Sequence, residues 1–346
     1  MKLIKQIGQS IVIAAVVGAG LASGVWAQDV TLRLHQFLPA PATVPAQILK
    51  PWAEAIEEDS GGRLRIQHFD AMSLGGTPPE LMDQARDGVA DITMAIVGYT
   101  PNRFPRTEVF ELPFIMTSAE ATSRAYWDLI ESELQDGEFK DVQVLAGWVH
   151  GPGAIHSKNP VRSLEDLVGQ KLRAPTRVSN DLLKELGATP VGIPLPATAE
   201  SLSKGVIDGT VISWEVVPAL RLNELVGYHT DFAGANGLYT TAIVLVMNKL
   251  KYDGLPEDLR AILDKHSGME LSATAGRIMQ ENDQAGRDAA KSSGNEIIVL
   301  DEAEVARWKA AAKPVYERWY EAMKARDIDG RALVDQVAAS ILAHSE

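Results

Sequence analysis

The sequence predicts an α/β protein made of two similar lobes, each a sheet flanked by helices. Strand-like and helix-like segments alternate along most of its 346 residues, which is typical of largely parallel sheets covered by helices. The length suits two domains of ordinary size better than one. The composition, with 46% hydrophobic and 23% charged residues, is that of a globular chain.

Hydrophobic periodicity and helix-ending signals predict the elements in order. The expected strands are residues 30–35, 64–69, 91–97, 142–149, 171–174, 210–214, 240–247 and 297–300. Helices are expected over residues 46–59, over 78–87 and, after Pro256, over most of the remaining chain. Thr77, Pro78 and Glu80 form a capping-box pattern, which predicts the start of the second helix.

A short internal repeat supports the two lobes. A strand that begins Gly-Arg-Leu-Arg (62–65) is followed by a helix and then by Gly-Val-Ala-Asp (88–91). The segment Gly-Gln-Lys-Leu-Arg (169–173) leads in the same way to Gly-Val-Ile-Asp (205–208). Glycine can end a helix in the left-handed conformation, and the β-branched residue after it begins the next strand. Two such lobes commonly bind a ligand between the carboxyl ends of their strands.

The first 27 residues read as a cleavable signal peptide. Lys2 and Lys5 precede an apolar run over residues 11–22, and Val25-Trp26-Ala27 places small residues where signal peptidase would cut before Gln28. An uncleaved N-terminal anchor is the alternative. The sequence therefore predicts a protein exported to the periplasm.

Composition and missing motifs argue against several functions. The net charge of −13 is unlike that of a nucleic-acid-binding protein. The absence of cysteine excludes thiol catalysis, disulfides and cysteine-based metal sites. No nucleophile elbow, phosphate loop or His-Glu-x-x-His motif is present in the sequence. His150 and His156 could ligate a metal ion, but no acidic residue stands beside them, so no metal site, cofactor or enzyme activity is expected.

Arg173 is the first candidate for ligand binding. It stands near the end of a short strand, just before Pro175, where the chain turns toward the expected crevice. A guanidinium can hold a carboxylate through two parallel hydrogen bonds, which a lysine cannot do. The alternative is an ordinary ion pair between domains.

Other candidates also lie at or near strand ends, on the side where a crevice would form. Trp214 and Trp148 could each line a pocket or fill a core. Glu215 could hold a cation or a ligand hydroxyl, or could be a solvated glutamate at a helix start. The remaining strand-end candidates are His35, Phe37, Tyr99, Arg103, His150 and His156.

Several motifs in fixed order resemble one known family. Residues 163–175 (SLEDLVGQKLRAP) are similar to the Gly-x-Lys-φ-Arg-x-Pro signature of DctP-type solute-binding proteins of tripartite ATP-independent periplasmic (TRAP) transporters. Further similar segments are residues 112–114 (LPF), 186–191 (LGATPV), 201–209 (SLSKGVIDG), 247–249 (MNK) and 255–259 (LPEDL). The resemblance covers essentially the whole mature chain.

The resemblance implies a two-lobed receptor with a long bridging helix that binds a small organic acid. It implies delivery of that acid to an ion-gradient-driven TRAP permease, and pairing of Arg173 with the ligand carboxylate. The expected first lobe is residues 28–149 plus about 239–278, and the expected second lobe is 150–238 plus about 279–346, with the C-terminal helices. Alternatives are a binding protein for an ATP-driven importer or a sensor and, less favoured, a secreted α/β hydrolase.

Two positions depart from the family pattern. Gly153 stands where many relatives carry a second arginine, and Ala197 stands where the family has a glutamate. The site is therefore expected to be wider or differently polar. His150, His156, Trp214 and Tyr99 are the side chains expected to compensate.

Overall fold

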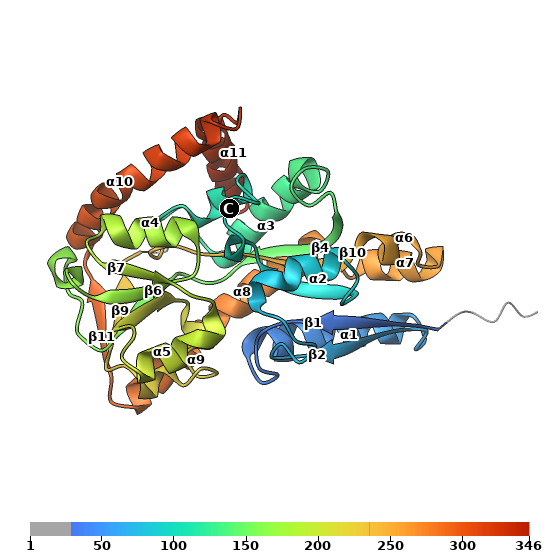
Figure 1. Cartoon of the computed structure of the whole chain (residues 1–346), viewed down its shortest axis with the longest axis horizontal. Coiled ribbons are helices and arrows are strands. Elements are labelled where there is room, and N and C mark those ends of the chain that lie inside the picture. The colour runs from blue at the N-terminus through green and yellow to red at the C-terminus, as the bar shows by residue number, and fades with distance from the viewer. Residues whose placement is uncertain (1–28, 235, 346) are drawn as a thin grey trace, which may run out of the picture.

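The computed structural model describes residues 29–234 and 236–345, so the expected signal peptide lies outside the described residues. Two separate sheets form the framework (Figure 1). The first has the order β2-β1-β3-β10-β4 and consists of β1 (Val30–His35), β2 (Leu64–Phe69), β3 (Ile92–Ile96), β4 (Val142–Val149) and β10 (Ala242–Asn248). The second has the order β11-β9-β5-β8-β6-β7 and consists of β5 (Ala154–Ser157), β6 (Lys171–Ala174), β7 (Thr189–Gly192), β8 (Gly209–Ile212), β9 (Tyr228–Phe232) and β11 (Glu296–Leu300).

Each sheet and the helices packed on it form one lobe. In the first lobe the π-helical segment η1 (Val44–Leu49) runs into α1 (Lys50–Asp59), which packs on β2. The same lobe contains α2 (Leu81–Arg86), α3 (Ala119–Leu129), α6 (Lys249–Asp253) and α7 (Glu257–Lys265). The expected capping box of Thr77 and Glu80 is confirmed; it precedes a short 3-10 turn (Pro78–Glu80) that leads into α2. The second lobe contains α4 (Arg177–Glu185) and α5 (Thr198–Ser203).

The expectation of largely parallel sheets needs one correction in each lobe. β10 is antiparallel to β3 and β4, and β5 is antiparallel to β8 and β9. Both strands come immediately after the chain crosses from the other lobe. Each of these two strands begins at the cleft and must run away from it. The strands β3, β4, β6 and β8 run toward the cleft and end there, so the directions are opposite. The expected strands did not include β5, β7 and β9, which are short.

A long helix connects the lobes, as expected. α8 (Met269–Glu281) packs on α3 and β4 of the first lobe, and α9 (Asp283–Ser292) continues it after a break at Asn282 and packs on β11 of the second. α10 (Glu302–Lys324) then packs on α4, and α11 (Gly330–Ala343) returns to α3 (Figure 1).

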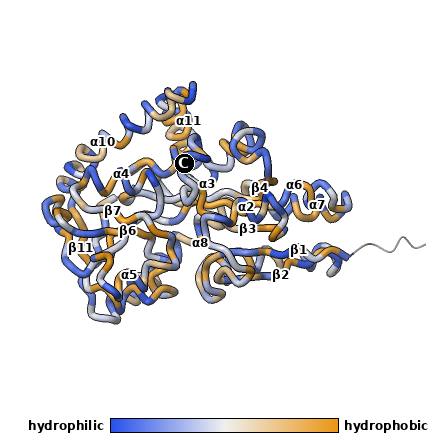
Figure 2. Tube along the Cα trace, viewed as in Figure 1, coloured by the Kyte–Doolittle hydropathy of each residue, from blue (hydrophilic) through white to orange (hydrophobic). Residues whose placement is uncertain are grey.

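The core follows the hydrophobic pattern of the sequence. Every residue of β3, β8 and β10 is buried, whereas hydrophilic and hydrophobic stretches alternate along the peripheral helices (Figure 2). Gly88 and Gly205, which end the two repeated helices, have φ angles of 73° and 70°, so the predicted left-handed C-caps are confirmed. Among the described residues, no helix is both long and apolar enough to cross a membrane.

Candidate functional site

A cavity lies between the lobes, where the carboxyl ends of their strands meet; the space between its lining atoms, including the part open to solvent, is about 450 Å³. Its walls are mainly apolar. The first lobe contributes Phe37, Val44, Met94 and Ile243, and the second contributes Leu195, Ile212 and Val216. Met279 of the bridging helix α8 completes this surface. Such a cavity suits a ligand with an apolar body.

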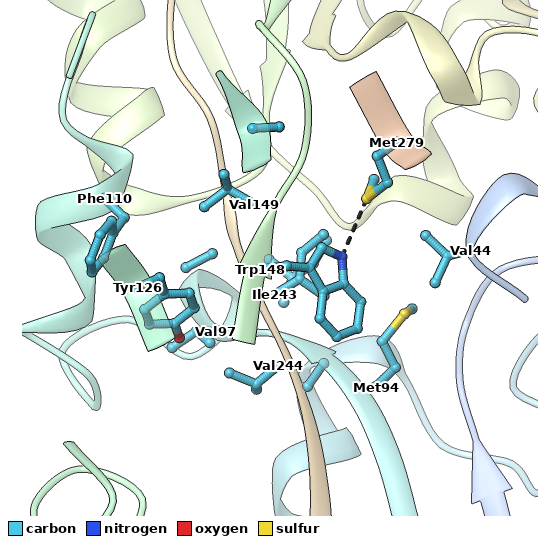
Figure 3. Packing of buried hydrophobic residues seen from close by; sticks show 14 of the residues in the cluster. Val44, Met94, Val97, Phe110, Tyr126, Trp148, Val149, Ile243, Val244 and Met279 are labelled. Atoms are coloured by element: carbon cyan, nitrogen blue, oxygen red, sulfur yellow. Dashed lines mark hydrogen bonds between the residues drawn. The ribbon is translucent and has the colours of Figure 1, made fainter. Parts of the chain in front are cut away.

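Trp148 supports this wall from behind and does not line the cavity. Its indole N–H donates to the sulfur of Met279 at 3.3 Å, and its side chain is fully buried. Figure 3 shows Val44, Met94 and Ile243 gathered around the same ring. Trp148 thus belongs to the core, which was one of its two expected roles, and fixes the positions of wall residues.

Arg173 is a buried cation in the cavity lining. Only 1% of its surface is exposed. Its Nε donates to the carbonyl of Ile193 at 2.9 Å, and its Nη2 donates to the hydroxyl of Tyr99 at 3.3 Å. Within the described chain it has no carboxylate partner, unlike Arg177, which pairs with Glu108. A buried guanidinium without a counter-charge is costly, so the site favours an anion.

Tyr99 brings a second polar group to the same place from the first lobe. It ends the short 3-10 turn that follows β3 (Val97–Tyr99). Its hydroxyl oxygen accepts hydrogen bonds from the Leu195 N–H, at 2.9 Å, and from Arg173. Burial raises the pKa of this hydroxyl, so it keeps its proton. Because both lone pairs of the hydroxyl oxygen already accept hydrogen bonds, the hydroxyl can donate its proton to an anion beside Arg173.

His150 adds no positive charge. Nδ1 lies 2.6 Å from the Gly151 carbonyl and Nε2 lies 3.1 Å from the hydroxyl of Thr241, which fits a neutral ring with its proton on Nδ1. Burial lowers the pKa of His150 to about 4. Arg173 is therefore the one permanent cation among the described residues that line the cavity.

Glu215 lines the cavity and is only 4% exposed, so the expectation of a solvated glutamate is wrong. Its backbone N–H donates to Oδ1 of Asp283 at 3.0 Å, and the Ser213 hydroxyl donates to its Oε1 at 3.1 Å. Burial, and then the negative charge of Asp283, raise the pKa of Glu215 well above its ordinary value.

The structure thus brings five of the ten candidates together at the cavity, and the other five, which include Trp148 and Arg103, do not line it. Phe37, Tyr99, His150, Arg173 and Glu215 are in the lining, whereas His35, His156 and Trp214 are not. The ring of His35 lies 2.6 Å from Oε1 of Gln84 and accepts from the N–H of Leu74, so it holds the loop after β2. Arg103 pairs with Asp83.

His156 and Trp214 point into the second lobe. There they contact His229, with ring centroids 4.8–4.9 Å apart. For His156, in β5, the reason is geometric: successive residues of a strand face opposite sides, so a position near a strand end does not fix the direction of the side chain. Trp214 was expected to end a strand, but β8 ends at Ile212 and Trp214 begins the 3-10 turn that follows (Trp214–Val216). Among the described residues no group of three potential ligands could hold a metal ion.

Tyr239 is a lining residue that the sequence analysis did not identify. A Cβ added at Gly153 would lie 2.5 Å from its ring. The tyrosine therefore occupies the space beside Gly153, the position at which the family resemblance implied a second arginine. The only available signal was the glycine itself, which permits this close approach.

Direct contacts hold the two lobes together beside the cavity. Arg177, in α4, pairs with Glu108, and its Nε donates to Oε1 of that residue at 3.0 Å. Nearby, Glu111 lies beside Thr176, which is the N-cap residue of α4. Burial raises the pKa of Glu111 to about 8. These contacts and the Tyr99–Arg173 hydrogen bond require the lobes to be closed.

Comparison with known proteins identifies several relatives. Residues 37–323 match the sequence profile of DctP, bacterial extracellular solute-binding protein, family 7. A TRAP solute-binding protein from Rhodoferax ferrireducens T118, solved with copurified benzoate, is 47% identical with a TM-score of 0.90, covering 91% of this chain and 98% of that one.

Two further relatives extend this comparison. A marine metagenome TRAP solute-binding protein specific for aromatic acids, solved with 3-hydroxybenzoate, is 42% identical with a TM-score of 0.90, covering 92% and 100% of the two chains. The C4-dicarboxylate-binding periplasmic protein DctP of Rhodobacter capsulatus is 25% identical over 327 residues, which are 92% of this chain and 96% of that protein.

Proposed function

We propose a ligand for this chain, which belongs to family 7 of the bacterial extracellular solute-binding proteins. It is therefore a solute-binding receptor of the TRAP type and not an enzyme. The proposed ligand is an aromatic monocarboxylate such as benzoate. The carrying observation is Arg173, a buried and unpaired guanidinium in a cavity with mainly apolar walls. An aromatic acid matches both features, because its ring suits the walls and its carboxylate supplies the missing charge.

The polar groups support one carboxylate and not two. Arg173 and the Tyr99 hydroxyl can hold a single carboxylate between the lobes. A second carboxylate would meet no further permanent cation among the described lining residues, and Tyr239 occupies the space beside Gly153. Burial of an unpaired charge is strongly unfavourable. The relatives that carry benzoate and 3-hydroxybenzoate, at 47% and 42% identity, support the same ligand class.

Calorimetric titration tests this proposal directly. Purified protein, first unfolded and refolded to remove copurified ligand, is titrated with benzoate and, as a matched control, with succinate. Benzoate is expected to bind at least about 100-fold more tightly, because burying the unpaired second carboxylate of succinate costs several kcal/mol. Tighter binding of succinate, or no binding of benzoate, would disprove the assignment.

We also propose that the protein is exported by cleavage before Gln28 and delivers its ligand to TRAP permease subunits. The family of extracellular solute-binding proteins supports this, as does the series of contacts that joins the lobes beside the cavity. Uptake of labelled benzoate by cells that carry the permease should require this protein. Equal uptake in cells that lack the receptor would contradict the proposed role.

A further inference from the structure

Glu215 has an unused hydrogen-bonding atom beside the cavity. Its Oε1 accepts from Ser213, but its Oε2 is buried and has no partner among the described residues. Buried polar atoms almost always have a partner in the protein, in ordered water or in a ligand. The free oxygen of Glu215 therefore requires an explanation.

The position of Glu215 is fixed by the surrounding structure. Its N–H donates to Asp283, at the start of α9 in the bridging helix, and its carboxyl is held by the residue two positions before it. A side chain held at both its backbone and one oxygen presents the other oxygen in a defined place. This is the arrangement that a selective contact needs, because little side-chain freedom is lost when a ligand binds.

We propose that the Glu215 carboxyl binds a hydroxyl group on the ring of the ligand, so that the preferred ligand is a hydroxylated aromatic carboxylate. The inference rests on the proposed function: Arg173 and Tyr99 hold the carboxylate, and Glu215 reads a substituent elsewhere on the ring. Glu215 thus acts as a specificity-determining residue, because an unsubstituted ring would leave its Oε2 buried and unpaired.

The electrostatic surroundings favour a hydroxyl over a cation. Burial and the neighbouring Asp283 favour the neutral carboxyl, and a neutral carboxyl can donate as well as accept a hydrogen bond. A phenolic hydroxyl has the same dual capacity and carries no charge into the cavity. A ligand ammonium group would instead require the ionised carboxylate.

The test compares benzoate with 2-, 3- and 4-hydroxybenzoate by calorimetric titration of the wild-type protein. Either 3- or 4-hydroxybenzoate is expected to bind about 10-fold to 100-fold more tightly than benzoate. No gain is expected for 2-hydroxybenzoate, because its hydroxyl lies beside the carboxylate and bonds to it internally. Wild-type protein that binds benzoate at least as tightly as both the 3- and the 4-isomer overturns the inference while leaving the proposed function intact. No binding of any of the four acids overturns both.

Variants then assign the preference to Glu215. Glu215→Met should lose the hydroxyl preference, measured as the ratio of the affinities for the hydroxybenzoate and for benzoate, whereas Glu215→Gln, which can still donate and accept, should retain most of it. The matched control is Glu111→Gln, since Glu111 is also a buried glutamate with an unpaired Oε2 but does not line this cavity. It should change the affinities for all four acids by the same factor. A hydroxyl preference that persists in Glu215→Met overturns the role of Glu215.

Discussion

The polar groups around the cavity differ from those buried in the second lobe. In the second lobe, His156, His229 and Trp214 form a cluster in which every ring nitrogen has a partner. At the cavity, by contrast, Arg173 and Tyr99 each have a hydrogen-bond donor that has no partner among the described residues. One carboxyl oxygen of Glu215 also has no hydrogen-bond partner there.

The hydrogen bonds of the second-lobe cluster run in one direction. The Asn295 amide donates to Nε2 of His229, at 2.9 Å, so the proton of that ring is on Nδ1 and points to Nδ1 of His156, 2.6 Å away. The remaining proton of His156, on Nε2, faces the carbonyl of Ile212 at 3.3 Å. A satisfied network of this kind stabilises a fold, whereas unused capacity beside a cavity marks a ligand site.

The largest effect that separates the two regions is expected from Arg173→Ala. Removing one partner of a buried charged pair should weaken benzoate binding by about 2–5 kcal/mol. Arg173→Lys should fall between wild type and alanine, because it keeps the charge but loses the planar fork. The free energy of unfolding without ligand should change little, because loss of the two hydrogen bonds to Ile193 and Tyr99 is offset by removal of an unpaired buried charge.

Arg177→Ala is the matched control for this prediction. Arg177 is also an arginine of the second lobe beside the cleft, but it pairs with Glu108 and does not line the cavity. Its loss should weaken benzoate binding by less than that of Arg173, as measured by calorimetric titration. Near-wild-type affinity in Arg173→Ala would show that the carboxylate is held elsewhere.

His229→Leu should have the opposite pattern of effects. It leaves His156 without its donor and should lower the free energy of unfolding by about 1–3 kcal/mol, measured in urea. Benzoate affinity should stay at the wild-type value. The double variant His156→Leu/His229→Leu should lose less than the sum of the two single variants, because both partners are then absent. Additive losses would show that the two rings do not depend on each other.

Between pH 6.5 and 8 the carboxyls beside the cleft and the histidine cluster should change the stability in opposite directions. Burial lowers the pKa of His229 from 6.5 to about 4, so the folded ring is neutral throughout this range, and loss of the remaining proton from the unfolded state raises the stability by only about 0.4 kcal/mol. Burial raises the pKa of Glu111 from 4.5 to about 8, so in this range the folded state holds a proton that the unfolded state has lost. Stability should therefore fall as the pH rises, by about 1–2 kcal/mol from Glu111.

Urea unfolding at several pH values measures this effect. Asp283, whose pKa burial raises to about 7, should contribute in the same direction. Glu111→Gln should remove about 1–2 kcal/mol of the decrease between pH 6.5 and 8. An unchanged slope in this variant would mean that Glu111 is already ionised in the folded protein.

The smallest effect is expected from Tyr99→Phe. The ring that contacts Phe37 at 6.1 Å between centroids is kept, but the hydroxyl that joins Leu195 and Arg173 is lost. Benzoate affinity should fall by about 1 kcal/mol, the net value of one hydrogen bond. Tyr316→Phe is the control, because its hydroxyl donates to Pro113 and does not touch the cavity. Equal effects of the two variants would remove Tyr99 from the carboxylate site.

Much of the fold follows from local sequence patterns. The expected strands at residues 142–149 and 171–174 agree with β4 and β6 in both bounds, and the capping box and the glycine C-caps are where the sequence places them. These features depend on residues a few positions apart, whose interactions form in any context. The strands β5, β7 and β9 did not show this signal, because polar residues, Pro190 or Gly192 interrupt their short apolar runs, so that they depend on their neighbours in the sheet.

The candidate site also has features that the sequence predicts and features that only the tertiary structure sets. The sequence by itself determined that an arginine able to hold a carboxylate ends a strand, and that polar residues gather near other strand ends. Only the tertiary structure decided which of them meet. Trp214 and Glu215 are adjacent in the chain, yet Glu215 lines the cavity while Trp214 donates to Asp231 in the second lobe. The direction of each side chain depends on backbone geometry and on the partners that neighbouring strands supply, and these partners come from distant parts of the sequence.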